Sequence, residues 1–192
     1  MSINYINEHY GSYRGLIRLQ LANLRWRLGQ YRGLNTPDWQ RVRRLVFVCQ
    51  GNICRSPYAH YLALQHTDKV ASLGYATTSA QAAYPLALKV AQQRGIDLST
   101  HRTTDINDFL FAPGDLLLVM EDRHLAKVQQ KAEQHQAQVA LLGLWATPVA
   151  ALLYDPYSLS EAYFHSCYQR IENAVSALIR EFLQAQSMQQ KA

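Results

Sequence analysis

The spacing of hydrophobic residues changes near residue 44, and this change divides the chain into two parts. Before it, apolar residues recur three and four positions apart, which is typical of one face of an α-helix; they are Tyr10, Tyr13, Ile17, Leu21, Leu24, Leu28 and Tyr31. Leu16, Leu19 and Trp26 lie on another side of the same helix. A helix with two apolar sides needs two packing partners, or one partner that nearly surrounds it.

A cluster of helix-breaking residues over 33–37 ends this segment. Thr36 is expected to cap a short helix that has Pro37 at its first position. The pattern therefore predicts a helical N-terminal arm, residues 1–43, followed by a globular domain, residues 44–192.

After residue 44, short continuous apolar runs alternate with helical segments. Strands are predicted at 45–48, 75–79, 115–120 and 139–142. Helices are predicted over 56–65, 85–94, 122–136 and 161–184. This alternation predicts an α/β fold with a doubly wound parallel sheet. In such sheets, ligands bind beyond the carboxyl ends of the strands.

The charge of the chain belongs mainly to the arm. The whole protein has 192 residues, 48% of them apolar, and a net charge of +5. Residues 1–44 hold eight arginines against two acids, Glu8 and Asp38, so the remaining residues are close to neutral. The arm lacks dense basic clusters, and we expect no nucleic-acid partner.

Cysteine and histidine usage limits the other classes of protein. Three cysteines (49, 54 and 167) are too few for a disulfide scaffold and indicate a reducing compartment. The N-terminus lacks the continuous apolar stretch of a signal peptide, and no run reaches the length of a membrane span. We therefore expect a cytoplasmic protein. The seven histidines have no metal-ligand spacing, so neither a metal nor another cofactor is expected.

The loop after the first predicted strand has the composition of an anion site. It reads Cys49-Gln50-Gly51-Asn52-Ile53-Cys54-Arg55-Ser56-Pro57. Gly51 and Asn52 tolerate left-handed backbone conformations, which let successive N–H groups point inward. The following helix adds its positive end, and Arg55 can hold two oxygens of a phosphoryl group. The same fields favour a thiolate at Cys49, the nucleophile that phosphoryl transfer to sulfur requires.

Two further features fit this chemistry. Asp155 follows the fourth predicted strand and is the candidate acid that protonates the leaving oxygen, although it could also be a simple turn aspartate. Tyr157 could form an aromatic wall against a phenyl ring. Cys54 is either a small buried hydrophobe or a thiol that traps oxidised Cys49 as a reversible disulfide. Cys167 is expected in the core.

The loop resembles the signature loop of the low-molecular-weight protein tyrosine phosphatases, and Asp155-Pro156-Tyr157 resembles their general-acid loop. Thr78-Ser79-Ala80, His101-Arg102 and Met120-Glu121 are similar to further family motifs in the same order. Residues 120–125, 144–145 and 155–160 resemble a narrower group, the bacterial phosphatases associated with exopolysaccharide and capsule export.

This resemblance implies a fold, a mechanism and a set of site residues. The fold is a three-layer α/β architecture whose four-stranded parallel twisted sheet has helices on both faces and a phosphate-binding loop after the first strand. Cys49 would be phosphorylated while Asp155 protonates the tyrosine oxygen, and Asp155 would then help water to release phosphate. Residues 50–55 would bind the phosphate. A supporting hydrogen-bond network would hold the loop open; its implied members are Asn52, Ser56, Ser79 and His101.

The partner implied is a phosphotyrosine protein, in the narrower group a bacterial tyrosine kinase. The stretch from Gln81 to Pro85 is shorter than is usual in the family, and Tyr84 could replace the wall that this loop normally supplies.

Arsenate reductases need further relay cysteines, which residues 120–166 lack. Protein arginine phosphatases tend to carry threonine where this chain has Ile53. A non-catalytic phosphotyrosine-binding module would have lost Cys49, Arg55 or Asp155.

The arm lies outside the resemblance, which covers about residues 44–184. We expect it to pack on the phosphatase domain or on a partner such as a second subunit. A membrane surface is an alternative, because arginines beside an apolar stripe suit anionic lipid.

Overall fold

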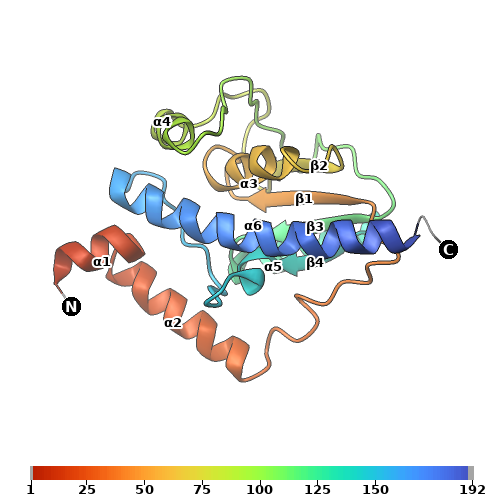
Figure 1. The fold of residues 1–192 in the computed structure, drawn as a ribbon, viewed down its shortest axis with the longest axis horizontal. Helices are drawn as coiled ribbons and strands as arrows, with labels where there is room; N and C mark the ends of the chain where they lie inside the picture. Colours follow the sequence, from red (N-terminus) through yellow and green to blue (C-terminus); the bar gives the residue numbers. More distant parts are fainter. Residues whose placement is uncertain (1, 190–192) are drawn as a thin grey trace.

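The computed structural model describes residues 2–189 and contains the predicted parallel sheet. Its strands are β1 (Arg44–Cys49), β2 (Val70–Gly74), β3 (Asp115–Val119) and β4 (Gln138–Leu141). Their order is β2-β1-β3-β4, and all neighbours are parallel (Figure 1). The chain therefore leaves β1 to one side and returns to its other side. This reversal opens a crevice at the carboxyl ends of β1 and β3, where such folds place their ligands.

Helices cover both faces of this sheet. The crossover helices are α3 (Arg55–Leu64), α4 (Pro85–Gln93) and α5 (Leu125–Gln134), and the chain closes with α6 (Glu161–Gln189). The β1–α3–β2 and β3–α5–β4 units run in opposite directions along the sheet, so right-handed connections place α3 and α5 on opposite faces. Helix α6 packs beside α3. No helix within residues 2–189 is long and apolar enough to cross a membrane.

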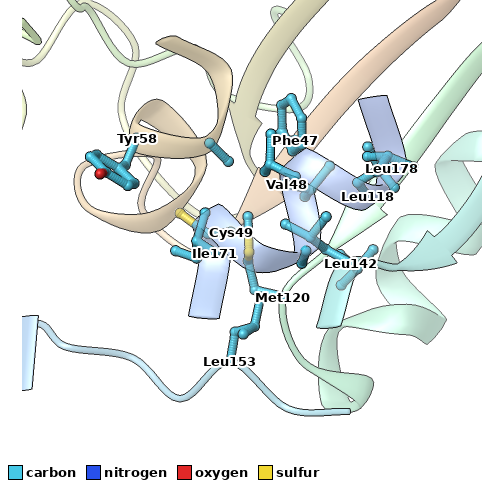
Figure 2. Packing of buried hydrophobic residues seen from close by; sticks show 14 of the residues in the cluster. Phe47, Val48, Cys49, Tyr58, Leu118, Met120, Leu142, Leu153, Ile171 and Leu178 are labelled. Atoms are coloured by element: carbon cyan, nitrogen blue, oxygen red, sulfur yellow. The ribbon is translucent and has the colours of Figure 1, made fainter. Parts of the chain in front are cut away.

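The core explains why the strands read as continuous apolar runs. Phe47, Val48 and Leu118 are completely buried on the central strands. Ile171 and Leu178 of α6 close over them, and Figure 2 shows these side chains packed together. Because both faces of the sheet are covered, most positions of the central strands are apolar whichever face they point to.

Three expected elements differ from the structure. The second strand is Val70–Gly74 and not 75–79; the backbone N–H groups of Tyr75 and Ala76 instead donate to Cys49 O and Gln50 O at 3.1 Å each, in the loop after β1. The helix predicted at 122–136 begins as a short 3-10 turn, Asp122–His124, before α5. No helix follows Thr36, because the described chain there is held along the sheet edge by β4.

The arm forms two helices and not one: α1 (Ile3–Tyr10) and α2 (Tyr13–Arg27). The break lies at Gly11, whose φ is +76°. A Cβ at this position would fall 2.7 Å from Leu159 and 2.8 Å from Tyr163, so only glycine fits here. Ser12 then caps α2 by accepting the backbone N–H of Gly15 at 3.1 Å.

Only one of the two predicted apolar sides of α2 has a packing partner among the described residues. Leu19 and Ala22 are buried and belong to the core cluster. Ile17, Leu21 and Leu24 lie on the opposite side and are 49–56% exposed. The arm therefore packs on the rest of the chain, while docking of its exposed side on a partner, a second subunit or a membrane stays a prediction, as does the domain division 1–43 and 44–192.

Beyond α2, the chain runs along β4, the outer strand of the sheet. The backbone N–H of Leu141 donates to Leu34 O at 2.9 Å, and the N–H of Asp38 donates to the side chain of Gln138 at 2.7 Å. Tyr31 donates from its hydroxyl to Asp122 at 2.6 Å. These contacts fasten the segment between α2 and β1 to one edge of the sheet.

Paired substitutions on α2 test how the arm packs. Leu19→Ala removes a buried side chain (7% exposed) and is expected to lower the free energy of unfolding by about 2 kcal/mol or more. Leu24→Ala, at a position that is 51% exposed, is the matched control and should change it by about 0.5 kcal/mol or less. Urea unfolding of both variants gives the two values. Equal values would contradict the packing of α2 described above.

Candidate active site

The loop predicted to bind an anion joins the carboxyl end of β1 to the first residue of α3. Cys49 is the last residue of β1, and Arg55 is the first of α3. The backbone N–H groups of Gly51–Cys54 donate to no acceptor within residues 2–189. A pocket of about 240 Å³ opens here; its lining residues are Cys49, Gln50, Gly51, Ile53, Cys54, Ala76, Asp155 and Tyr157. Backbone N–H groups without an acceptor, next to the positive end of a helix, are typical of an anion cradle, that is, a site that binds an anion.

Ser56 lies against the thiol of Cys49. Its Oγ is 3.1 Å from Cys49 Sγ and accepts a hydrogen bond from Asn52 Nδ2 at 2.8 Å. The hydroxyl proton of Ser56 can be donated to the sulfur at 3.1 Å or to the carbonyl oxygen of Leu73 at 3.4 Å, and a negatively charged sulfur is the stronger acceptor. A thiolate at Cys49 would therefore receive a charge-assisted hydrogen bond.

Asn52 fixes the shape of the loop. It adopts a left-handed conformation, with φ of +53°. Its Nδ2 also donates to Ser72 Oγ at 3.0 Å, and its Oδ1 accepts the backbone N–H of Thr104 at 3.0 Å. The ring Nε2 of His101 donates to the Asn52 carbonyl at 2.7 Å. Burial lowers the pKa of His101, so this ring is neutral at physiological pH. The side chain of Asn52 thus offsets the unfavourable backbone conformation.

Ser79 does not belong to this network, and its expected place is taken by Ser72. The hydroxyl of Ser79 donates to Asp108 at 2.6 Å and accepts from the backbone of Asp105 at 2.8 Å. This correction follows from the position of β2. With the strand at 70–74, the inward-facing serine near the loop is Ser72, while Ser79 lies five residues beyond the strand end.

Arg55 is completely buried and surrounded by acceptors. Its Nη1 donates to Glu121 Oε1 at 2.6 Å and to the carbonyl of Leu153 at 2.7 Å. Its Nη2 is 2.6 Å from Asp155 Oδ2, a charge contact that lacks the alignment of a hydrogen bond. Burial alone would lower the pKa of Arg55, but the two carboxylates outweigh it and raise the pKa, so the side chain stays charged. Within residues 2–189, Nε and Nη2 find no aligned acceptor.

Glu121 is a site residue to which the sequence assigned no role. It is fully buried just after β3, and Arg123 Nε is 2.8 Å from its second oxygen. Burial opposes its ionisation, yet the charge of Arg55 and the hydrogen bonds from both arginines keep its pKa lowered. An acid directly behind a buried strand, at the ligand-binding edge of the sheet, was the signal that could have identified it.

Asp155 lies in the loop between η2 (Leu142–Trp145) and α6. The loop is anchored on both sides of the carboxylate: the N–H of Leu153 donates to Met120 O at 2.9 Å, and the hydroxyl of Tyr163 donates to Tyr154 O at 3.1 Å. Asp155 Oδ1 accepts the N–H of Tyr157 at 3.2 Å. Its side chain is 28% exposed while that of Arg55 is 1% exposed, so solvent reaches this carboxyl.

The two predicted aromatic walls lie together. The rings of Tyr84 and Tyr157 have centroids 5.0 Å apart, and Tyr157 is half exposed. The backbone N–H of Tyr84 donates to Ile53 O at 2.9 Å, which ties the wall to the phosphate loop. A flat apolar ring could therefore pack against these two tyrosines, next to the anion cradle.

Gly74 is a second residue without a sequence-based role. It ends β2 directly beneath the loop, and a Cβ there would fall 2.9 Å from Gln50 O and 3.1 Å from Asn52 Cβ. A side chain at residue 74 would collide with the loop, so only glycine fits at this position.

Cys49, Cys54 and Cys167 are all buried and free. Burial raises the pKa of Cys54 well above its ordinary value and raises that of Cys167 to about 12. No group of three or more potential ligands within residues 2–189 is arranged to hold a metal ion.

Comparison with known proteins matches the globular part of the chain. Residues 44–191 match the family model of the low molecular weight phosphotyrosine protein phosphatases. Wzb of Escherichia coli (strain K12), a low molecular weight protein-tyrosine-phosphatase, is 32% identical over 148 residues, or 76% of this chain and 97% of Wzb. The probable phosphatase EpsP of Ralstonia nicotianae is 31% identical over 72% of this chain and 94% of EpsP.

Solved structures agree with these matches. Wzb from Escherichia coli K30 in complex with sulphate superposes with a TM-score of 0.63 at 31% identity, over 73% of this chain and 98% of Wzb. The arginine phosphatase YwlE has a TM-score of 0.62 over 72% of this chain and 94% of YwlE, but its 22% identity shows a common fold alone. The arm, residues 1–43, lies before the matched segment. By sequence, fold and the loop between β1 and α3, the chain belongs to the low molecular weight phosphotyrosine protein phosphatase family.

Proposed function

We propose that this protein hydrolyses phosphotyrosine in proteins, with Cys49 as nucleophile, Arg55 as phosphate-binding cation and Asp155 as general acid and base. The observation that carries the proposal is the meeting of these three side chains at one sheet edge. Cys49 and Asp155 line the same pocket, and Arg55 Nη2 lies 2.6 Å from Asp155. A phosphoryl group held by Arg55 is thereby brought beside both the sulfur and the carboxyl.

In the first step, the Cys49 thiolate attacks phosphorus. The S–P bond forms while the P–O bond to tyrosine breaks, and Asp155 gives its proton to the leaving phenol oxygen. The loop amides of residues 50–55 and the free edge of the Arg55 guanidinium stabilise the charge on the phosphoryl oxygens. Tyr84 and Tyr157 flank the phenyl ring.

In the second step, water replaces the cysteine sulfur. Asp155, now a carboxylate, takes a proton from the attacking water as the O–P bond forms. The S–P bond breaks, phosphate leaves, and Cys49 returns as a thiolate that the hydroxyl of Ser56 stabilises. Ser56, Asn52, Ser72 and His101 keep the loop open for each turnover.

Other reactions of the same fold have less support. Ile53 presents a branched apolar side chain at the pocket, which suits a flat phenyl ring better than a polar guanidinium, so a tyrosine phosphatase is favoured over an arginine phosphatase. Residues 120–166 contain no cysteine that could relay a disulfide, as an arsenate reductase requires. The intact set of Cys49, Arg55 and Asp155 argues against a binding module without catalysis.

We further propose that the protein acts in the cytoplasm on a bacterial tyrosine kinase of exopolysaccharide or capsule production. The resemblance of residues 120–125 and 155–160 to that group supports this role, and its free thiols support a reducing compartment.

Two substitutions test the mechanism. Cys49→Ser is expected to abolish turnover of a small aryl phosphate, because the hydroxyl is a far weaker nucleophile than a thiolate. Asp155→Asn should lower kcat by about 10²- to 10⁴-fold for a phenol that leaves poorly and by less for nitrophenol, which needs no proton. Steady-state kinetics and trapping of the phosphoenzyme give both results. Unchanged turnover in Cys49→Ser would refute the mechanism directly.

Cys54 is expected to protect the enzyme from irreversible oxidation. Peroxide would convert the Cys49 thiolate to a sulfenic acid, and the sulfur of Cys54 would then displace water to form a disulfide. Cys54→Ser should keep its activity but recover less of it than wild type after peroxide followed by dithiothreitol. Cys167→Ser, at the third buried thiol, is the control and should recover like wild type. Equal recovery in both variants would exclude this role.

A phosphorylated substrate tests the pathway. The purified enzyme should release phosphate from an autophosphorylated exopolysaccharide tyrosine kinase with a higher kcat/KM than from unrelated phosphotyrosine proteins. Loss of anti-phosphotyrosine signal over time is the measurement, with Cys49→Ser as the inactive control. Equal rates on all substrates would argue against a dedicated kinase partner.

A further inference from the structure

A second hollow adjoins the active-site pocket. It has a volume of about 530 Å³, and Asp155 and Tyr157 line both it and the pocket over the phosphate loop. Its outer wall comes from α2 of the arm, through Arg14 and Arg18, and from Arg123 behind β3. The hollow is therefore open to residues that flank a phosphotyrosine held in the pocket.

The hollow is strongly basic on its arm side. Arg123 is partly neutralised, because its Nε lies 2.8 Å from Glu121. Arg14 and Arg18 are exposed and form no ion pair or hydrogen bond with any residue of the described chain. The sequence of α2 contains four arginines and no acid. Asp155, the one acid of the hollow, already contacts Arg55.

The arm holds α2, the helix that carries Arg14 and Arg18, close to the loop before α6. A Cβ at Gly15 would lie 2.9 Å from the ring of Tyr154, so the helix passes this residue at close range. Asn23 of α2 accepts the backbone N–H of Ala151 at 3.0 Å, and the Arg18 guanidinium lies 6.0 Å from the Tyr154 ring centroid. The residue after Tyr154 is the general acid Asp155. The same loop thus joins the arm to the reaction centre.

We propose that Arg14 and Arg18, together with Arg123, form a subsite for carboxylate side chains that flank the phosphotyrosine of a protein substrate. Guanidinium groups match carboxylates in charge and in the planar geometry of their donors. Arg14 and Arg18 precede residue 44, where the family match begins, so this subsite adds a selectivity to the common reaction. The inference rests on the proposed phosphatase function and specifies its substrate class as acidic phosphotyrosine segments.

The test compares kcat/KM for two phosphotyrosine peptides of equal length, one with glutamate and one with glutamine around the phosphotyrosine. Wild type should prefer the glutamate peptide at low ionic strength, and added NaCl should reduce the preference. In the double variant Arg14→Gln, Arg18→Gln, the ratio of kcat/KM for the glutamate peptide to that for the glutamine peptide should fall by about five- to tenfold. This is the effect expected for the loss of two partly exposed ion pairs. The control Arg27→Gln, Arg32→Gln removes the same charge from exposed positions outside the hollow and should keep the wild-type ratio.

A small aryl phosphate, which is too short to reach the subsite, separates the two levels of the proposal. If wild type does not hydrolyse it, the phosphatase function fails. If wild type hydrolyses it but shows no preference between the peptides, or if both double variants change the ratio equally, only the subsite is overturned.

Discussion

Burial of one positive charge organises the active-site end of this protein. Arg55 has no exposure to water, so its guanidinium must be neutralised by neighbouring groups or the fold would carry a large desolvation cost. Glu121 from the end of β3, Asp155 from the loop before α6 and the carbonyl of Leu153 supply that compensation. The cation thus fastens the end of β3 and the loop before α6, which are far apart in sequence, to the start of α3.

The same arrangement prepares the site for its chemistry. Glu121 is held as a carboxylate by Arg55 and Arg123, and it takes one side of the guanidinium. The other side, with Nε and Nη2, has no aligned hydrogen-bond acceptor within residues 2–189, although Nη2 has a charge contact with Asp155. Under the proposed function, this side takes the phosphoryl oxygens. The contacts of Nη1 with Glu121 and the Leu153 carbonyl fix the orientation of the guanidinium, which in the proposed mechanism leaves little reorganisation for the transition state.

Much of this could be predicted because chemistry and periodicity coincided in the sequence. The apolar run of β1, the small residues after it and the start of α3 identified the loop from Cys49 to Arg55. Asp155 was a candidate because its place after the fourth strand put it at the same edge of the sheet, and in the structure it lies 2.6 Å from Arg55 Nη2. The α/β class followed from the alternation of strands and helices and was confirmed.

What could not be predicted depended on register and on three-dimensional proximity. Val70–Gly74 is short and holds Ser72 between apolar residues, so its strand was placed five residues too late. The resemblance of Thr78-Ser79-Ala80 to a family motif assigned Ser79 to the network, where the structure has Ser72. The break at Gly11 depends on the nearness of Leu159 and Tyr163, which no local pattern reveals. Likewise, the spacing of apolar residues on α2 could not tell which of its two sides would be buried.

The bond between Leu34 and Leu141 has a consequence for the sheet itself. An outermost strand presents unpaired backbone groups, which invite another chain to add a strand and begin aggregation. The segment that follows α2 lies over β4 and uses part of that edge, with Asp38 and Gln138 extending the cover. Besides placing Arg14 and Arg18 beside the active-site pocket, the N-terminal segment therefore covers backbone groups through which another chain could pair with this edge.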